Sequence, residues 1–374
     1  MRIRTSVMVT AALLAAALIA GCATPCERAA LGRSDAAMAR TQSTDPPGKI
    51  IVGTVMEAYY GTFDGLDDRL ARLGELIDLM AARAAERYDG AGLDLAALQE
   101  IAVNGGRKGT AAEVSFPLEG AVLDAMGAKA RQHRCYIVVP MYLAESELTG
   151  RPEGTYANAA VLLDRDGEIA GIYRKVYPVA VGPDNVLEGG VLPGRTFPVF
   201  ECDWGRLGIQ ICFDMAYDAG WDALDRGGAE LVVWSTQSPG QIKAAARALR
   251  HRYYVLTSTW RNNASLFDPT GAMIREIRQD RDEGPVFVER IDLSYVLLGW
   301  QPALRNGAAF DDAFGPRAGY RYSEAEDGGI FWSNDPDLPV MEMVEQLELD
   351  LPAGEIALNR RLQDAARGGP PEAE

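Results

Sequence analysis

Three residues whose side chains could do chemistry together each follow a predicted strand: Glu100, Lys175 and Cys212. Cys212 lies between an apolar run at residues 207–211 and a predicted helix at residues 216–228. A cysteine at such a junction is held out of the sheet near backbone N–H groups, a setting that suits a thiolate nucleophile. Taken singly, a buried cysteine and two solvated charges would be the ordinary interpretation. Together they make a thiol-dependent reaction the hypothesis to test.

The histidine content restricts the competing catalytic chemistries. The chain has two histidines, His133 and His251, and each stands beside an arginine. A zinc site or a serine–histidine–aspartate triad would need one of them, and both fit solvated faces of helix ends. Catalysis that uses neither histidine is therefore favoured.

Composition limits the class of protein. The chain has 374 residues, of which 48% are hydrophobic, so it can bury a large core. Its formal net charge is −16. This charge argues against nucleic-acid partners and against a polybasic membrane patch, and it suits a surface that faces small substrates.

The N-terminal residues predict an export signal. Arg2 and Arg4 precede an apolar segment at residues 7–20, which is too short for a comfortable membrane span. The segment ends in Leu-Ile-Ala-Gly-Cys at residues 18–22, which resembles a bacterial lipobox. In such signals the peptide is cut before the cysteine, so Cys22 is the expected site of lipid attachment. The alternative is an ordinary secretory signal with a chance cysteine.

The segment after the lipobox predicts how the chain is anchored. Residues 1–21 are expected to be removed, and residues 22–48, with scattered proline, serine and threonine, predict a tether. Ala23 follows Cys22 where aspartate would stand in another class of lipoprotein, and this resembles lipoproteins sent to the outer membrane. We therefore expect a protein of the cell envelope, lipid-anchored to the outer membrane and facing the periplasm.

Strands and helices alternate from residue 49 onwards. Apolar residues spaced three and four apart over residues 66–87 predict an amphipathic helix. Further helices are predicted at residues 117–131, 216–228, 241–253 and 355–367. Strands are predicted at residues 49–56, 93–98, 135–140, 158–163, 169–174, 196–200, 207–211, 230–234, 255–259, 265–268 and 286–291. Because hairpin turns cluster in the middle, we expect an α/β layered domain with some antiparallel strand pairs.

Four blocks of this sequence resemble the nitrilase, or carbon–nitrogen hydrolase, superfamily. They are residues 94–100, residues 158–175 with Tyr-Arg-Lys at their end, residues 205–214 with Ile-Cys-Phe-Asp, and residues 258–271 with Asp-Pro-Thr-Gly. The resemblance covers residues 49–291 in the family's order. It implies a four-layer α-β-β-α sandwich over residues 49–295. One departure is Gln99, which stands where relatives usually carry proline.

The resemblance also implies catalytic roles. Cys212 would attack an amide or carbamoyl carbon, Glu100 would accept and return the proton, and Lys175 would stabilise the thiolate and the oxyanion. The backbone N–H of Phe213 would be the second oxyanion donor, and Glu188 would position substrate or water. This chemistry requires no metal and no organic cofactor.

The sequence indicates less about the substrate and the partners than about the reaction. Tyr142 stands in one of two stretches, residues 142–156 and 176–191, that are expected to line the pocket for a small amide-type substrate. Two alternatives stay open: an acyltransferase that passes the same thioester to an amine, and a non-catalytic envelope lipoprotein that binds ligands. The resemblance implies a homodimer or higher oligomer through the helix at residues 215–228. The C-terminal extension, residues 296–374, is expected to end in a disordered tail and could wrap a neighbouring subunit.

Overall fold

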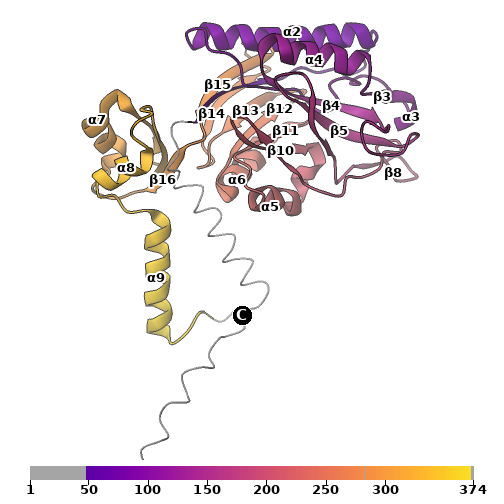
Figure 1. The fold of residues 1–374 in the computed structure, drawn as a ribbon. Helices are drawn as coiled ribbons and strands as arrows, with labels where there is room; N and C mark the ends of the chain where they lie inside the picture. Colours follow the sequence, from indigo (N-terminus) through magenta and orange to yellow (C-terminus); the bar gives the residue numbers. More distant parts are fainter. Residues whose placement is uncertain (1–47, 282, 372–374) are drawn as a thin grey trace, which may run out of the picture.

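The computed structural model describes residues 48–281 and 283–371. The predicted signal peptide, Cys22 and nearly all of the tether lie outside these residues, as does the end of the predicted disordered tail. Among the described helices, none is long and apolar enough to cross a membrane. The main body consists of two sheets packed face to face, with helices on the two outer faces (Figure 1).

The first sheet has the strand order β15-β1-β2-β4-β5-β6, and β3 pairs with β4. Strands β1, β2 and β4 run parallel, whereas β15, β5 and β6 are antiparallel to their neighbours. Helices α2 (Leu66–Arg87) and α4 (Ala121–His133) cover its outer face with an apolar core. The strands are β1 (Lys49–Val55), β2 (Leu95–Ala97), β3 (Phe116–Pro117), β4 (Tyr136–Ala144), β5 (Tyr156–Leu163), β6 (Ile169–Arg174) and β15 (Val286–Asp292).

The second sheet has the strand order β14-β13-β12-β11-β10-β9. Strands β10, β11 and β12 are parallel, and the others are antiparallel to their neighbours. Helices α5 (Asp218–Arg226) and α6 (Gln241–His251) pack on its outer face. The strands are β9 (Val199–Cys202), β10 (Gly205–Ile211), β11 (Leu231–Ser235), β12 (Tyr254–Ser258), β13 (Asn263–Phe267) and β14 (Met273–Arg278).

Hydrogen bonds join the two sheets at the edge where their parallel strands end. Ser235 Oγ donates to the Leu98 carbonyl at 2.8 Å. Ser258 Oγ lies 3.1 Å from the Val55 carbonyl and 3.2 Å from the Ala97 carbonyl. These buried polar contacts join the carboxyl ends of β11 and β12 to those of β1 and β2. Glu100 follows β2, and Cys212 follows β10, the parallel neighbour of β11, so the candidate site lies at this edge.

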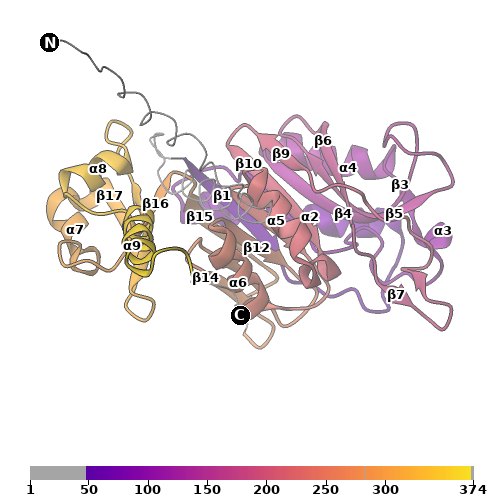
Figure 2. The same ribbon diagram turned by 90° about the horizontal axis from the view of Figure 1, so that it is seen from below.

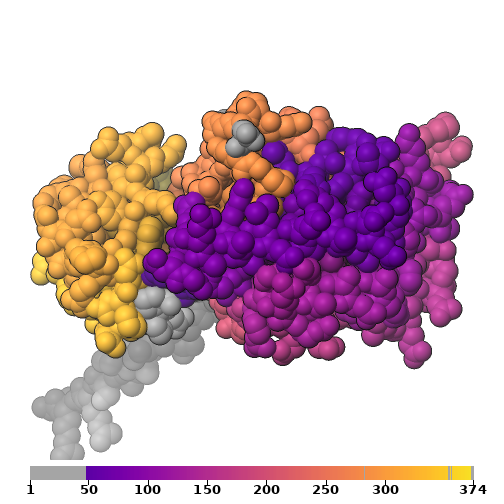
Figure 3. All heavy atoms as spheres, turned by 90° about the horizontal axis from the view of Figure 1, so that it is seen from above, coloured from indigo at the N-terminus to yellow at the C-terminus, as the bar shows by residue number. Residues whose placement is uncertain are grey.

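A separate small unit follows the body. It contains a three-stranded sheet in the order β16-β18-β17 and a core of its own around Val296, Phe310 and Phe331. It forms a distinct mass at one end of the body (Figure 3). Its elements are β16 (Tyr295–Gly299), α7 (Ala308–Phe314), β17 (Ala318–Ser323), β18 (Gly328–Ser333) and α8 (Val340–Gln346), with 3-10 turns at Arg305–Gly307 and Gly315–Arg317. None of the strands of this sheet was expected from the local sequence pattern.

Helix α9 (Pro352–Arg367) contains the predicted helix at residues 355–367. It extends away from the unit in Figure 1 and is seen nearly end-on in Figure 2. Three short elements complete the described chain, namely α3 (Ala111–Val114), β7 (Ala180–Val181) and β8 (Val186–Leu187).

Two predicted helices differ from the observed ones. The helix expected from residue 117 begins at Ala121, because Pro117 lies in β3 and Gly120 adopts a φ of 79°. The helix expected at residues 216–228 is shorter, since α5 covers Asp218–Arg226, and a 3-10 turn, η1 (Cys212–Ala216), precedes it. Between them Tyr217 is extended, so Cys212 lies in a tight turn before the helix.

Candidate active site

The structure brings together three of the predicted residues around one buried ammonium group. Lys175, directly after β6, places Nζ 2.8 Å from Glu100 Oε1 and 2.6 Å from Glu188 Oε1. The Lys175 and Glu100 side chains are each 1% exposed, and that of Glu188 is 7% exposed. A buried ion pair needs close geometry and further hydrogen bonds to offset the loss of solvation. This cluster has both.

Asn158 on β5 supplies part of that support. Its Nδ2 donates to Glu100 Oε1 at 3.0 Å and to Glu188 Oε2 at 2.8 Å. The Val179 N–H also donates to Glu188 Oε1 at 3.0 Å. Asn158 was not predicted as a site residue. The signal that could have identified it is a single amide side chain within an otherwise apolar strand.

Cys212 lies at the first position of η1, directly after β10. Its φ is 43°, in the left-handed region that residues other than glycine seldom adopt. Its carbonyl accepts a hydrogen bond from Trp234 Nε1 at 3.0 Å. Backbone strain of this kind persists only where the surroundings hold it, and it is concentrated at functional sites.

The electrostatic environment keeps the resting thiol protonated. Burial raises the pKa of Cys212 to about 12, and the neighbouring Glu100 carboxylate acts in the same direction, while Lys175 and Thr236 lower it. Burial lowers the pKa of Lys175, but the charges of Glu100 and Glu188 more than offset this, so its pKa is raised and it stays cationic. The Cys212 thiol therefore faces a carboxylate and an ammonium group together.

One oxygen of Glu100 is available to accept a proton. Glu100 Oε2 is buried, and within residues 48–281 and 283–371 no donor lies in hydrogen-bonding geometry to it. The other oxygen is occupied by Lys175 and Asn158. The backbone of Glu100 is held by Trp260, whose Nε1 donates to the Glu100 carbonyl at 2.9 Å. The free oxygen thus belongs to a carboxylate that is fixed on its other side.

The loop before Glu100 accommodates the departure from the family pattern. Gln99 is buried and its Nε2 donates to the Glu57 carbonyl at 3.0 Å. Proline could not make this bond. The loop that carries Glu100 is therefore held by a side-chain contact of this chain's own.

The remaining predicted residues flank the cluster. Tyr142 on β4 pairs in register with Asn158 on β5. Burial raises the pKa of Tyr142, as do the charges of Glu188 and Glu100. Phe213, next to Cys212, is 41% exposed, and its ring lies edge-on to that of Tyr217. The role of the Phe213 backbone N–H as an oxyanion donor stays a prediction.

Neither histidine lies in the cluster. His133 Nε2 contacts Asp78 Oδ1 at 2.6 Å on the outer helices. His251 was expected on a solvated face, which is wrong: it is 2% exposed and stacks on Tyr253 at the end of α6. Its burial follows from the packing of α6 on the second sheet, which the local sequence did not reveal.

The three cysteines of the described chain, Cys135, Cys202 and Cys212, are free thiols. In residues 48–281 and 283–371, no group of three or more histidine, cysteine, aspartate or glutamate side chains is arranged to hold a metal ion.

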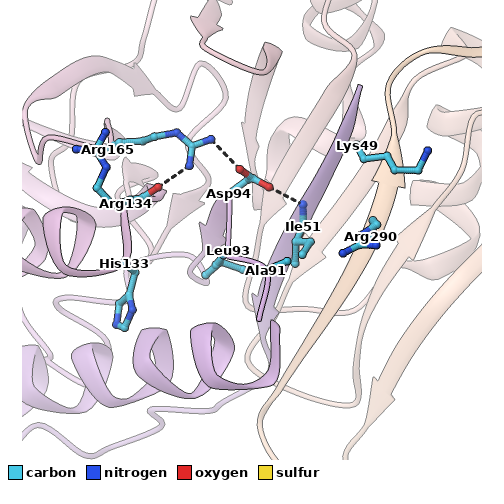
Figure 4. Close-up of a pocket in the computed structure, with 10 residues that line it drawn as sticks. Lys49, Ile51, Ala91, Leu93, Asp94, His133, Arg134, Arg165 and Arg290 are labelled. Carbon is cyan, nitrogen blue, oxygen red and sulfur yellow. Dashed lines mark hydrogen bonds and ion pairs between the residues drawn. The ribbon is translucent and has the colours of Figure 1, made fainter. Parts of the chain in front are cut away.

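A hollow of about 350 Å³ lies at the opposite end of β2, lined by several cations (Figure 4). Its charges are largely compensated within the protein. Arg165 contacts Asp94 at 2.7 Å and Asp203 at 2.6 Å, and Lys49 contacts Asp292 at 2.9 Å. Arg165 therefore ties the two sheets together here, remote from the Cys212 cluster.

Comparisons with known proteins identify a matching family and several relatives. The family model described as Carbon-nitrogen hydrolase matches residues 66–297. Beta-ureidopropionase of Arabidopsis thaliana is 25% identical over 150 residues, 38% of this chain and 36% of the relative. N-carbamoylputrescine amidase of the same plant is 30% identical over 101 residues, 27% of this chain and 32% of the relative. The chain thus spans about a third of the length of these relatives.

Solved structures show the same fold. Nit3 of Saccharomyces cerevisiae, a member of the nitrilase superfamily, has a TM-score of 0.52 at 17% identity, covering 65% of this chain and 90% of that one. The NitFhit protein of C. elegans has a TM-score of 0.55 at 16% identity, covering 67% and 62%. The predicted α-β-β-α sandwich is therefore confirmed. The family match ends at residue 297, so most of the small C-terminal unit lies outside it.

Proposed function

Because the chain belongs to the carbon–nitrogen hydrolase family, we propose that it hydrolyses a non-peptide carbon–nitrogen bond of a small amide or carbamoyl compound. The reaction would run through a thioester on Cys212. The observation that carries this proposal is the buried Lys175 ammonium group, held between Glu100 and Glu188 beside the thiol. A purely structural ion pair would need neither the strained cysteine nor the unoccupied carboxylate oxygen next to it.

In the first step, Glu100 Oε2 accepts the thiol proton while Cys212 Sγ forms a bond to the carbonyl carbon. The electron pair of the C=O bond moves to oxygen, and Lys175 with the Phe213 N–H stabilises the resulting oxyanion. Because the resting thiol is protonated, this proton transfer is coupled to the attack.

The tetrahedral intermediate then collapses. The carbon–nitrogen bond breaks, the nitrogen takes the proton held by Glu100, and amine or ammonia leaves behind a thioester. Glu100 next removes a proton from water, whose oxygen attacks the thioester carbon. Collapse of this second intermediate breaks the carbon–sulfur bond, and the proton returns to Cys212. Asn158 and Glu188 keep Lys175 and Glu100 in place throughout.

The names of the relatives guide the substrate class. They include a beta-ureidopropionase, N-carbamoylputrescine amidases and omega-amidases. We propose small primary amides and N-carbamoyl amines as the first compounds to test. Acyl transfer would use the same thioester, and adding an amine acceptor and analysing the products would separate it from hydrolysis.

We also propose that the protein is lipid-anchored through Cys22 in the cell envelope and faces the periplasm. Support comes from the charged start, the short apolar segment and the lipobox-like residues 18–22. Mass spectrometry of the full-length protein from bacterial membranes would show a diacylglyceryl adduct, and Cys22→Ser would abolish it. A mature protein that begins after Cys22 and carries no lipid would contradict the proposed anchor.

Intact-protein mass spectrometry tests the catalytic proposal directly. The full-length protein would be mixed with the amide and N-carbamoyl panel and quenched, with Cys212→Ala as the variant and Cys202→Ala as the matched control. We expect an acyl adduct and turnover with the wild type and with Cys202→Ala, and neither with Cys212→Ala. Unchanged hydrolysis by Cys212→Ala would refute the proposal.

A further inference from the structure

Asp214 connects the turn that carries Cys212 to the segment that carries Lys175. The residue is completely buried. Its Oδ2 accepts hydrogen bonds from the Ile211 N–H at 3.0 Å and from Tyr173 Oη at 2.7 Å. Its Oδ1 accepts from the Tyr177 N–H at 3.0 Å. One carboxylate thus contacts the residue before Cys212 and residues on both sides of Lys175.

The geometry points to Asp214 as a positioning residue that, in its ionised form, holds the Cys212 turn against Lys175. This inference rests on the proposed function, since it concerns the alignment of the same nucleophile and cation. All three partners of the carboxylate are donors, so each bond requires an acceptor oxygen on Asp214. A proton on that carboxyl group would remove the negative charge that strengthens all three bonds, and on Oδ2, which already accepts two, it would compete with a donor.

The surroundings define how this group titrates. Burial raises the pKa of Asp214 to about 6, while its bonds from Tyr173, Ile211 and Tyr177 and the charge of Lys175 lower it. Burial also raises the pKa of Tyr173 well above its usual value, so the phenol stays neutral.

Two neighbouring side chains also contact Asp214 or its partner Tyr173. Gln210 Nε2 lies 3.3 Å from Tyr173 Oη, which leaves the phenol proton for Asp214. From α5, the neutral indole of Trp221 donates from Nε1 to the Asp214 carbonyl at 3.2 Å. Protonation of Asp214 in mildly acidic solution would therefore loosen the alignment of Cys212 and Lys175.

The rate at which iodoacetamide alkylates Cys212 reports this alignment without any substrate. It would be measured by intact mass and peptide mapping on the full-length protein, from acid to neutral pH. The variants are Asp214→Asn, which puts an amide donor among three donors, and Tyr173→Phe, which removes one bond and keeps the charge. The matched control is Asp268→Asn, a similarly buried aspartate that accepts hydrogen bonds from the N–H and the hydroxyl of Thr270 in the turn after β13.

We expect Asp214→Asn to slow alkylation of Cys212 by about tenfold or more at neutral pH, because a displaced thiol loses its cation and base. Tyr173→Phe should match the wild type at neutral pH but lose reactivity at a higher pH on acidification, because the bond that lowers the pKa of Asp214 is gone. Asp268→Asn should follow the wild-type profile. Thermal unfolding and circular dichroism would verify that each variant is folded.

Two results would overturn the inference. One is a folded Asp214→Asn protein that is alkylated at the wild-type rate or faster. The other is a Tyr173→Phe profile that coincides with the wild type across the acid range, which would decide the matter if Asp214→Asn did not fold. If alkylation behaves as expected and no amide is hydrolysed, the proposed function fails and the positioning role stands.

Discussion

Replacing Lys175 by methionine should destabilise the protein in a way that depends on pH. The substitution keeps an unbranched side chain that is one atom shorter and removes the charge between Glu100 and Glu188. The Nζ distances of 2.8 and 2.6 Å place the two Oε1 atoms at most about 5.4 Å apart. At an effective dielectric constant of about 20, two unit charges at that separation repel each other by about 3 kcal/mol.

The variant can reduce this repulsion only by binding a proton. In neutral solution, folded Lys175→Met would then hold one more proton on the two carboxylates than the unfolded chain does. Stability falls with rising pH wherever the folded state binds more protons. The free energy of unfolding of Lys175→Met should therefore increase on acidification towards pH ~5, relative to the wild type.

Urea denaturation at several pH values, followed by fluorescence, would measure this effect. The double variant Lys175→Met/Glu188→Gln removes one of the two like charges and should regain about 2–3 kcal/mol at neutral pH. Lys129→Met is the matched control, because Lys129 pairs with Asp78 on the partly exposed outer helices. The free energy of unfolding of Lys129→Met should fall by no more than about 1 kcal/mol. The electrostatic explanation would be refuted if the stability difference between Lys175→Met and the wild type did not change with pH and the double variant regained no stability.

Three further predictions concern other parts of the molecule. Asn158→Ala should lower kcat by about tenfold or more, because both carboxylates lose their shared amide donor, and steady-state kinetics would reveal it. Phe331→Ala should cost about 3–5 kcal/mol in the C-terminal unit, seen by denaturation as a separate or shifted transition. Light scattering of the protein in detergent, corrected for bound detergent, should give at least a dimer, and a monomeric mass would count against an interface through α5.

Local pattern was sufficient where neighbouring residues decide the structure. Helix α2 has the predicted bounds, Leu66–Arg87, because its apolar spacing repeats over several turns. Strand β6 likewise matches its predicted range, Ile169–Arg174, and ends directly before Lys175. The placement of Glu100, Lys175 and Cys212 after strands could thus be derived from the chain alone, and the family resemblance supplied their proposed roles.

The C-terminal unit shows where local pattern was insufficient. Strand β16 pairs with β18, although the whole of α7 and β17 lies between them in the chain. Such a sheet is stabilised by cross-strand contacts between distant residues, including Phe331 opposite Val296 and Tyr320. No short window of sequence contains these pairs, so the region was expected only to be an extension.

By itself, the sequence determined the order of the strands and helices in the body and which of them end in an ionisable or nucleophilic side chain. Only the tertiary structure decided that Asn158 would join Glu100 to Glu188, that Asp214 would contact both sides of Lys175, and that His251 would be buried. The physical reason is that periodicity reports which face of an element is apolar. Hydrogen-bond partners depend instead on atoms that packing brings within about 3 Å from distant parts of the chain.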